Sequence, residues 1–340
     1  MRSIYSVTMD SLKKFFTSHG YKEFKAKQVY DWLYKKKVHS FDDMYNISKK
    51  VIELLKENFY FDTIKLITKT SAIDVSKFLF QVSNDMVEAV CMYHDYGISL
   101  CISTQVGCNM GCSFCESGRL KKVRNLEISE MVLQILKVED EIKNRISRVV
   151  LMGIGEPFDN YDNVISFIDI INDANGIALG SRHITISTCG IVPKIKKFME
   201  YDKQVNLAIS LHAPNDEIRN KIMNINKVYN IDLLIKTLKE YIKKTNRRVT
   251  FEYIMLKDVN DTKKCALLLS NLLKQINCYV NLIPYNETSH IEYKKSPQKN
   301  ILAFYDILKK NNINVTIRRE FGSKVNAACG QLRANYEEDL

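Results

Sequence analysis

Three cysteines in a single stretch of eight residues constrain this chain more than any other feature. Cys108, Cys112 and Cys115 are spaced C-x3-C-x2-C in the stretch Gly-Cys-Asn-Met-Gly-Cys-Ser-Phe-Cys. Three thiolates on one short loop can bind three of the four irons of a 4Fe–4S cubane. The fourth iron then has no protein ligand. This indicates a second cofactor, S-adenosylmethionine (SAM), and radical chemistry that belongs to the cofactors rather than to side chains.

A zinc site and a group of buried core cysteines are the alternative interpretations. Zinc usually takes four ligands, often in paired C-x2-C knuckles. The six histidines supply no H-x3-H pair, and no second knuckle is present. Free cysteines are often buried in cores, but Gly107, Asn109 and Gly111 indicate a loop rather than a core strand. The stretch therefore predicts an iron–sulfur site.

The composition predicts a cytoplasmic protein that has a large core. With 340 residues, 46% of them hydrophobic, the chain can form a main domain and a smaller one. Nine cysteines without a signal-peptide pattern indicate a reducing compartment rather than a disulfide scaffold. No run of 18 or more apolar residues is present, so no membrane partner is expected.

The net charge of +11 favours a polyanionic partner. The alternative is a lysine-rich surface that is simply solvated, and charge alone does not separate the two. A basic stretch directly follows the three cysteines and is a candidate for phosphate contacts. It consists of Arg119, Lys121, Lys122 and Arg124. Arg318 and Arg319 are further candidates near the end of the chain.

The first ~90 residues read as a small basic helical domain followed by short strands. Apolar residues recur at helical spacing in three segments. These are Leu12, Phe15 and Phe16, then Val29, Trp32 and Leu33, then Val51, Leu54 and Leu55. The stretch Phe78–Val82 is strand-like.

From about residue 98 the pattern alternates between strands and helices. Apolar and β-branched runs predict strands at 99–104, 149–152, 183–188, 205–210, 249–254, 279–283 and 314–318. Amphipathic segments predict helices that include 128–136, 164–171, 233–242 and 301–308. Repeated strand–helix units imply a parallel sheet, either barrel-like or doubly wound.

Polar and glycine-containing motifs follow the predicted strands. The three cysteines follow the first strand, Gly153–Pro157 follows the second, and Ser187–Gly190 ends the third. Ser210–Pro214 and Pro284–Asn286 end two later strands. Functional groups in parallel α/β folds gather at the carboxyl ends of strands. The motifs are therefore expected on one face of the sheet.

Taken together, these motifs resemble those of the radical SAM rRNA methyltransferases of the RlmN/Cfr family. The resemblance covers essentially the whole chain. Besides the three cysteines it rests on Cys101-Ile-Ser-Thr-Gln-Val-Gly-Cys108, Met152-Gly-Ile-Gly-Glu-Pro157, Ser210-Leu-His-Ala-Pro-Asn-Asp216, Val280-Asn-Leu-Ile-Pro284 and Ala327-Ala-Cys-Gly-Gln-Leu332. It implies an α/β fold, a radical SAM partial (β/α)6 barrel with a small N-terminal helical accessory domain. The implied division is an accessory domain at 1–93, a core at 94–325 and a C-terminal segment at 326–340.

The resemblance to the RlmN branch implies methylation of carbon 2 of an adenine in the peptidyl-transferase centre of 23S rRNA. It also implies methylation of an adenine beside the anticodon of some tRNAs. The resemblance further implies that two SAM molecules are used per turnover. One would methylate Cys329, and the other would yield a 5′-deoxyadenosyl radical that activates this methyl group. Cys101 would then resolve the protein–RNA adduct, leaving a Cys101–Cys329 disulfide, and Glu88 would be the proton acceptor.

The resemblance also implies the cofactor-binding residues. Cys108, Cys112 and Cys115 would bind one 4Fe–4S cluster. The residues implied to bind SAM are Gly155, Glu156, Ser187, Ser210, Leu211, His212 and Asn286. Taken singly, residues of these types more often cap or satisfy local backbone. The implied partners are 23S rRNA, tRNA and an electron-donor protein such as flavodoxin, and the expected state is a monomer.

Three alternatives remain at this stage. A Cfr-type enzyme would methylate carbon 8 of the same adenine and confer antibiotic resistance. Val106, Pro157 and Pro284 favour the RlmN branch, since Cfr proteins tend to have other residue types at these positions. The second alternative is a non-catalytic RNA-binding protein with a structural cluster. The third is a radical SAM enzyme that acts on a small molecule.

Two positions depart from the family pattern, and four cysteines have no implied role. Glu116 places an unusual carboxylate beside the third cluster cysteine, and Asn326 replaces a common acidic residue before Ala-Ala-Cys. Cys91, Cys189, Cys265 and Cys278 are interpreted as small hydrophobic residues.

Overall fold

A ten-stranded sheet runs through the part of the chain that the structure describes, residues 1–318 of a computed structural model. Its strand order is β14-β13-β12-β11-β10-β9-β6-β5-β4-β3. The strands are β3 (Lys65–Ser71), β4 (Val75–Val82), β5 (Asp85–His94), β6 (Gly97–Cys101), β9 (Arg148–Leu151), β10 (Ile184–Thr188), β11 (Asn206–Ser210), β12 (Val249–Met255), β13 (Cys278–Pro284) and β14 (Val315–Ile317). Pairing is antiparallel from β3 to β6 and parallel from β6 to β14.

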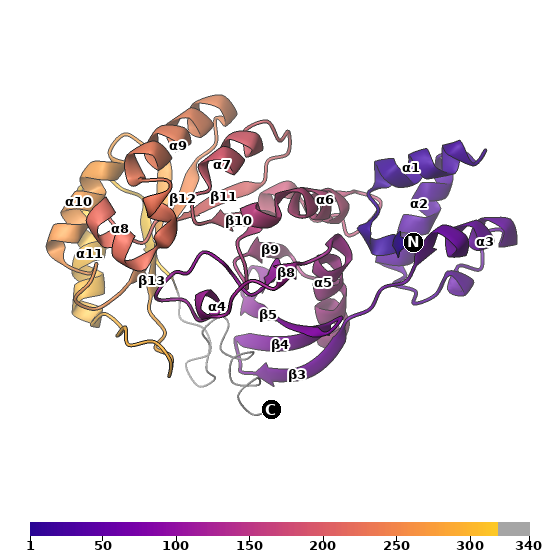
Figure 1. Cartoon of the computed structure of the whole chain (residues 1–340), viewed down its shortest axis with the longest axis horizontal. Helices are drawn as coiled ribbons and strands as arrows, with labels where there is room; N and C mark the ends of the chain where they lie inside the picture. The colour runs from indigo at the N-terminus through magenta and orange to yellow at the C-terminus, as the bar shows by residue number, and fades with distance from the viewer. Residues whose placement is uncertain (319–340) are drawn as a thin grey trace.

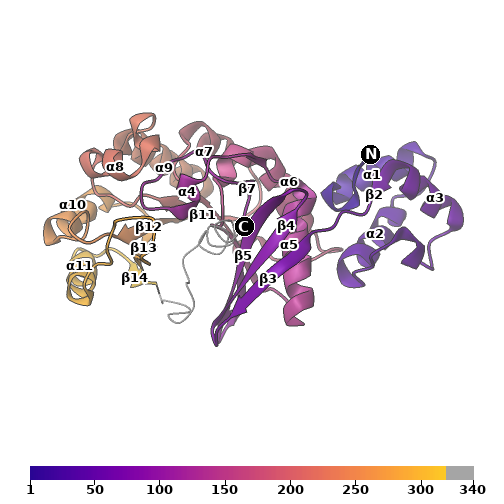
Figure 2. The same ribbon diagram turned by 60° about the horizontal axis from the view of Figure 1, so that its bottom comes forward.

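Helices connect the parallel strands and cover one face of the sheet (Figure 1). They are α5 (Ile128–Ile142), α6 (Tyr161–Asn172), α7 (Val192–Phe198), α8 (Asp216–Ile222), α9 (Ile231–Thr245), α10 (Lys263–Leu273) and α11 (Gln298–Lys310). The other face is concave, and we call the space that it encloses the lumen. Arg318, just after β14, places Nη2 4.0 Å from Sδ of Met92 on β5. These strands lie far apart in the sheet, so the sheet curls into a partial barrel, with β3–β5 and β12–β14 on opposite sides (Figure 2).

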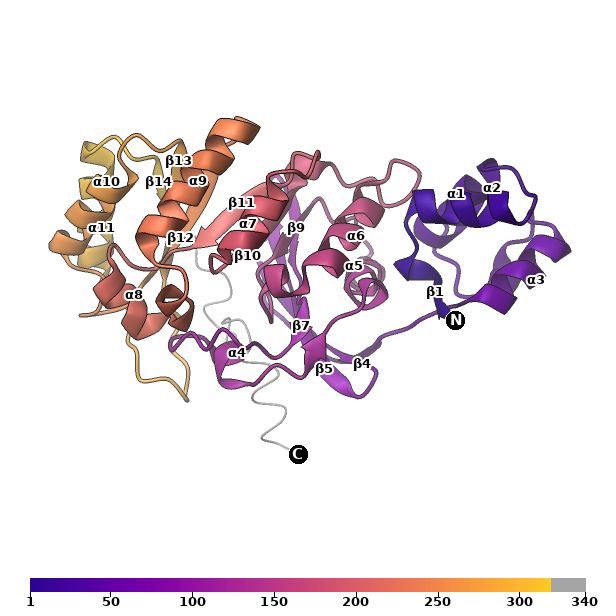
Figure 3. The same ribbon diagram turned by 45° about the horizontal axis from the view of Figure 1, so that its top comes forward.

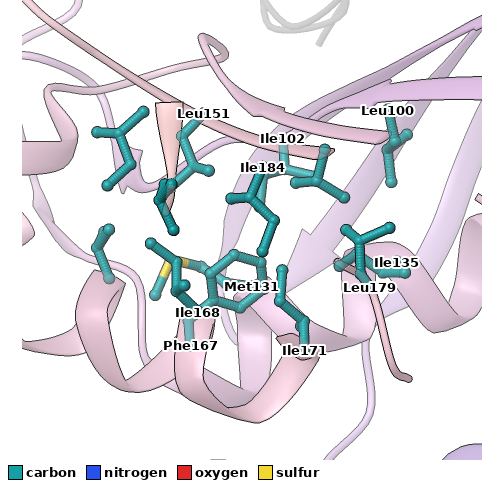
Figure 4. Packing of buried hydrophobic residues seen from close by; sticks show 14 of the residues in the cluster. Leu100, Ile102, Met131, Ile135, Leu151, Phe167, Ile168, Ile171, Leu179 and Ile184 are labelled. Carbon is teal, nitrogen blue, oxygen red and sulfur yellow. The ribbon is translucent and has the colours of Figure 1, made fainter. Parts of the chain in front are cut away.

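The main core lies between the sheet and its helices (Figure 4). Leu100, Ile102, Leu151 and Ile184 point from the strands and the first loop toward α5 and α6 (Figure 4). They pack against Met131, Ile135, Phe167, Ile168 and Ile171. A smaller apolar group lies on the lumen face and consists of Val75, Val90, Met92 and Cys101. Strand alternation therefore assigns each side chain either to the helix side or to the lumen.

The N-terminal residues form a helical unit at the end of the molecule opposite α10 and α11 (Figures 1 and 3). It contains β1 (Arg2–Ser3), η1 (Ile4–Ser6), α1 (Met9–Ser18), α2 (Phe24–Tyr30), η2 (Asp31–Lys35), η3 (Phe41–Asp43), α3 (Lys49–Asn58) and β2 (Phe59–Tyr60). Thr8 caps α1 by accepting a hydrogen bond from the backbone N–H of Ser11. The three predicted helical segments are confirmed.

Strands β3, β4 and β5 continue the main sheet, although the sequence pattern grouped their residues with the N-terminal segment. The reason is a tight hairpin between β5 and β6. Gly97 has a φ of +124° there, and His94 pairs with it across the turn. The predicted strand at Phe78–Val82 lies within β4. No helix among residues 1–318 is both long and apolar enough to cross a membrane.

Candidate functional site

The loop that carries the three cysteines leaves the carboxyl end of β6 and is closed by a short hairpin. This hairpin pairs β7 (Gln105–Val106) with β8 (Arg124–Asn125). Gly107 lies against the backbone carbonyl of Lys121 with a positive φ, so a side chain at this position would clash. The N–H of Cys108 donates to the carbonyl of Leu120 at 3.0 Å. The loop is therefore fixed at both ends, and we call residues 102–123 the cluster loop.

Cys108, Cys112 and Cys115 are partly exposed and near one another on this loop. Burial, and repulsion among the three sulfurs, raise the pKa of the Cys108 thiol to about 12 and that of Cys112 higher still. Among residues 1–318, no three His, Cys, Asp or Glu side chains converge as a single-ion site requires. In a cubane each cysteine binds a different iron. The donor set thus fits a cubane better than one zinc ion.

The cluster loop packs against two other loops. The N–H of Ser113 donates to the carbonyl of Ile222 at 3.0 Å, which brings the cluster loop, including the short helix α4 (Glu116–Arg119), to the C-terminal end of α8. Figure 3 shows α4 and α8 on the same side of the molecule. The hydroxyl of Ser113 lies 2.9 Å from that of Tyr293, in the loop after β13. The cysteines are thereby held over the carboxyl ends of the parallel strands.

Glu116, the departure next to Cys115, also joins these loops. It is buried, and its Oε2 lies 3.1 Å from Nη1 of Arg119 and 3.5 Å from Nδ1 of His290. Its Oε1 is buried without a hydrogen-bond partner within the described residues. Through its contact with His290, this carboxylate therefore links the loop after β13 to the cluster loop.

Gly155 and Glu156 lie in the loop after β9. Gly155 has a φ of +107°, and a side chain there would clash with Gln105. Glu156 is buried, and both of its carboxylate oxygens accept hydrogen bonds from backbone N–H groups. Oε1 accepts from Phe158 at 3.0 Å and Oε2 from Cys189 at 2.8 Å. Burial raises the pKa of this carboxyl group. Its described contacts join two loops, and its contact with SAM stays a prediction.

The residues predicted at the ends of β10 and β11 lie together. Oγ of Ser187 is 3.5 Å from Oγ of Ser210. His212 has a φ of +57°, and its Nδ1 accepts a hydrogen bond from the N–H of Ile254 at 3.0 Å. Its ring lies edge-to-face with Phe114 of the cluster loop, at a centroid distance of 5.0 Å. Burial and the Arg219 cation lower the pKa of His212 to about 3, so the ring is neutral at physiological pH.

Arg219 was not identified from the sequence, yet it joins the ends of these strands. It is fully buried on α8. Its Nη2 donates to the carbonyls of Cys189 at 2.6 Å and Ser210 at 3.1 Å. Its Nε donates to the carbonyl of Leu211 at 3.1 Å, and its Nη1 to Oδ1 of Asn226 at 2.9 Å. One guanidinium thus fixes the backbone on which Ser210 and Leu211 are carried.

Cys101 and Glu88 lie on the lumen face, on the antiparallel side of the site. Both are buried. Cys101 pairs with Val90 of β5, and Val90 pairs with Lys77 of β4. Glu88 precedes Val90 by two residues and therefore points to the same face. Cys329 and the segment 326–340 lie outside the described residues.

Lys77 is a second residue that the sequence analysis missed. It is 1% exposed, and strand register places it in the same row across the sheet as Cys101. A lysine beside the apolar run Phe78-Leu-Phe80 was the available signal, because a buried charge requires a specific environment. The lumen therefore contains a buried lysine near the predicted catalytic pair.

Asn286 follows β13 and is exposed. It belongs to the loop after β13. Tyr293 and His290 of the same loop contact Ser113 and Glu116 of the cluster loop. The structure thus brings Asn286 to the same end of the sheet as the other predicted cofactor residues.

The basic stretch after the cysteines is largely paired with acidic side chains. The pairs are Arg119 with Glu116, Lys122 with Asp159, and Arg124 with both Asp85 and Glu130. Lys121 is exposed. Hydrogen bonds to Glu130 raise the pKa of Arg124. Arg124 therefore stabilises the cluster loop, and phosphate contact by this stretch stays a prediction.

Comparisons with known proteins agree with this arrangement. The sequence model of the Radical SAM superfamily matches residues 102–267, and that of the ribosomal RNA large subunit methyltransferase N-terminal domain matches residues 3–61. A radical SAM methyltransferase from Sphaerobacter thermophilus, known from its crystal structure, has a TM-score of 0.91 and is 34% identical. The match covers 97% of this chain and 99% of that one.

Curated relatives match over nearly the whole chain. A Listeria monocytogenes protein named "Probable dual-specificity RNA methyltransferase RlmN" is 52% identical over 342 residues, covering 98% of this chain and 93% of its own length. An Enterococcus faecalis protein of the same name is 53% identical over 342 residues, covering 98% and 96%. Radical SAM chemistry implies a 4Fe–4S cluster and SAM, which fits the donor set on the cluster loop. The chain belongs to the RlmN family of radical SAM methyltransferases.

Proposed function

We propose that the protein methylates carbon 2 of an adenine in the peptidyl-transferase centre of 23S rRNA, and of an adenine beside the anticodon in some tRNAs. The names of the curated relatives support RNA as the substrate class. The observation that carries the proposal is the buried pair Cys101 and Glu88 on the lumen face, below the cluster loop. A protein that only bound RNA would need neither group there.

The proposed roles divide between two sets of residues. Cys108, Cys112 and Cys115 would hold the cluster. The residues proposed to bind SAM are Gly155, Glu156, Ser187, Ser210, Leu211, His212 and Asn286. When bound, the cluster and two SAM molecules per turnover would supply a methyl group and a carbon-centred radical. The buried lumen would exclude water from this reaction.

The remaining steps belong to side chains of this chain. Cys329 would carry the methyl group that is transferred to the base. Glu88 would accept the proton that leaves carbon 2. The thiol of Cys101 would release the product by forming a disulfide with Cys329, and a reductant must then restore both thiols. Because Cys101 and Glu88 are buried, the target adenine has to leave its stacked position to reach them.

The proposal includes the partners and the organisation of the chain. We propose a cytoplasmic monomer that receives electrons from a protein such as flavodoxin. We also propose that the helical part of residues 1–93 forms an accessory unit that helps bind RNA. Residues 94–325 would form the core together with β3–β5, which continue its sheet, and 326–340 would deliver Cys329. The net charge of +11 supports an RNA partner.

The test is mass spectrometry of nucleosides from unmodified 23S rRNA and tRNA after anaerobic incubation with cluster-loaded protein, SAM and a reductant. We expect 2-methyladenosine from the wild type and none from Cys101→Ala or Cys329→Ala. Cys265→Ala, a buried cysteine on α10, is the matched control and should retain activity. An 8-methyladenosine product would contradict the carbon 2 assignment. Formation of 5′-deoxyadenosine without a methylated base would exclude these RNAs as substrates.

A further inference from the structure

A buried glutamate in the lumen has a carboxylate oxygen with no partner among residues 1–318. Glu252 lies on β12 and is 4% exposed. Its Oε1 accepts a hydrogen bond from Nδ2 of Asn281 at 3.3 Å, but its Oε2 is buried and unpaired within the described residues. Buried acceptors normally have a donor. The open oxygen therefore indicates that a ligand supplies one.

Strand alternation directs Glu252 to the lumen. Its neighbours Phe251 and Tyr253 belong to the main core on the helix side. Side chains of successive strand residues point to opposite faces. The carboxylate therefore faces the concave side, where a bound cofactor can reach it.

Register places Glu252 in a polar row that begins at the predicted SAM site. Ser210 of β11 pairs with Glu252, Glu252 pairs with Asn281 of β13, and Asn281 pairs with Thr316 of β14. Oγ of Ser210 is also 3.5 Å from Oγ of Ser187. Glu252 is therefore the next polar side chain in the lumen after the two serines.

The row holds the carboxylate in one orientation. Oγ1 of Thr316 donates to Oδ1 of Asn281 at 2.7 Å, which leaves the amide N–H₂ of Asn281 directed at Glu252. With one oxygen held in this way, the other lies on the lumen side, buried and without a hydrogen-bond partner among the described residues. A site whose supporting residues are themselves hydrogen-bonded is preorganised for its ligand.

The charge balance indicates a neutral donor. Burial raises the pKa of the Glu252 carboxyl group, and the nearby Arg318 cation lowers it. Arg318 thus already supplies a compensating positive charge. The missing partner then has to supply a hydrogen bond rather than a charge. Among the donors of SAM, the ribose hydroxyls and the 6-amino group of adenine are neutral, whereas the ammonium group is charged. Of the two neutral donors we infer the ribose, which has a precedent as the partner of a carboxylate. Carboxylates bind ribose hydroxyls in the same manner in dinucleotide-binding folds.

We propose that Oε2 of Glu252 accepts a hydrogen bond from a ribose hydroxyl of SAM, and that Asn281 and Thr316 are positioning residues for this contact. This inference rests on the part of the proposed function that places SAM in the lumen. It does not depend on which RNA base is methylated.

The test is equilibrium dialysis of SAM with anaerobic, cluster-loaded protein in the absence of RNA. Loss of one hydrogen bond to a charged acceptor should weaken binding about 10- to 100-fold. We expect Glu252→Met to show this loss, Glu252→Gln a smaller one, and Thr316→Val the smallest. Glu139→Gln is the matched control, because Glu139 is a buried glutamate on α5, paired with Lys37 away from the lumen. Its affinity for SAM should equal that of the wild type.

The 2′-deoxy and 3′-deoxy analogues of SAM give a second readout that a general loss of structure would not produce. For one of the two analogues, the affinity of the wild type should be as low as the affinity of Glu252→Met for SAM. Glu252→Met should then bind this analogue only slightly more weakly than the wild type does. Unchanged SAM affinity in Glu252→Met would overturn the proposal. So would independent effects, in which Glu252→Met weakens the binding of both deoxy analogues by the same factor as it weakens the binding of SAM. Loss of binding to a tRNA anticodon stem–loop with normal SAM affinity would also overturn it and assign the oxygen to RNA. If the wild type binds SAM but forms no methyladenosine, the proposed function fails while this inference stands.

Discussion

Two regions of the molecule, the loop after β9 and strand β12, each bury a glutamate, and the two carboxylates meet their hydrogen-bond donors in different ways. In the loop after β9, Glu156 accepts backbone hydrogen bonds on both oxygens, from Phe158 and Cys189. On β12, Glu252 accepts one side-chain hydrogen bond from Asn281 on Oε1, and its buried Oε2 has no partner among residues 1–318. Burial raises the pKa of both carboxyl groups. The two carboxylates are thus equally buried but differ in the number of hydrogen-bond donors that contact them.

The number of donors around a buried carboxylate distinguishes a structural role from a ligand-binding role. A carboxylate whose oxygens are both occupied by backbone donors stabilises the loops that supply those donors. A buried carboxylate oxygen without a donor has lost its hydrogen bonds to water and gained none from the protein, and a ligand can supply the missing hydrogen bond. Substitution at Glu156 should therefore lower the stability of the fold in addition to any effect on the proposed SAM contact, whereas substitution at Glu252 should act mainly on cofactor affinity.

The largest effect is expected at Arg219, which lies between the two regions. Arg219→Met should lower the free energy of unfolding by roughly 3–4 kcal/mol, because three carbonyls and one amide oxygen lose a buried donor. Urea denaturation measures this. Arg182→Met is the control, since Arg182 is exposed and should change stability by less than about 0.5 kcal/mol. Equal changes in the free energy of unfolding for the two variants would contradict the conclusion that the hydrogen bonds of Arg219 hold these segments together.

The comparison itself predicts opposite outcomes for two identical substitutions. Glu156→Gln replaces one acceptor by an N–H₂ group that faces a backbone N–H, so stability should fall by roughly 1–3 kcal/mol. Glu252→Gln keeps an acceptor for Asn281 and removes a buried charge, so stability should stay the same or rise. Thermal unfolding of both variants decides the matter. A larger loss in Glu252→Gln would reverse the comparison.

The pH dependence of stability should differ in sign between His212 and Glu252. The pKa of His212 is lowered to about 3 in the folded protein, so only the unfolded chain binds its proton between about pH 6.5 and 3. Its contribution to stability is therefore lost as pH falls, at up to about 1.4 kcal/mol per pH unit. The raised pKa of Glu252 has the opposite effect, because above pH 4.5, the ordinary pKa of a glutamate, the unfolded chain loses this proton more readily than the folded protein does. Stability is therefore lost as pH rises above 4.5.

Two variants separate these contributions. His212→Asn keeps an acceptor for the N–H of Ile254 and tolerates the positive φ, but it does not titrate. Its unfolding free energy should fall less than that of the wild type between pH 6.5 and 5. Glu252→Gln should fall less as pH rises above 5. Denaturation at several pH values checks both, and parallel curves for all three proteins would show that neither group contributes.

The parallel part of the fold could be predicted because its signals are local. Apolar β-branched runs gave the strands, and the glycine and cysteine spacing gave the loop after the first of them. The curvature of the sheet is not local. Glu252 alternates with Phe251 and Tyr253, a pattern that a half-exposed strand would share, and only the approach of Arg318 to Met92 shows that this face encloses a lumen.

Arg219 shows the same limit on a helix. In the sequence it lies within Asp216-Glu-Ile-Arg-Asn-Lys221, which reads as a charged, solvated helical face. In the structure, carbonyls at the ends of β10 and β11 converge on it. Lys77 is similar, because strand register rather than composition places it in the same row of the sheet as Cys101, with Val90 between them. A side chain's partners come from distant segments, so no local pattern can identify them.

The smallest expected effect is the coupling between the two glutamates. Glu156 and Glu252 share no hydrogen-bond partner within the described residues. The stability changes of Glu156→Gln and Glu252→Gln should therefore add, with a coupling energy below about 0.5 kcal/mol in a double-mutant cycle. A coupling above about 1 kcal/mol would show that the loop after β9 and the row on β12 form a single network. Arg219 would then be its connection, and repeating the cycle in Arg219→Met should remove the coupling.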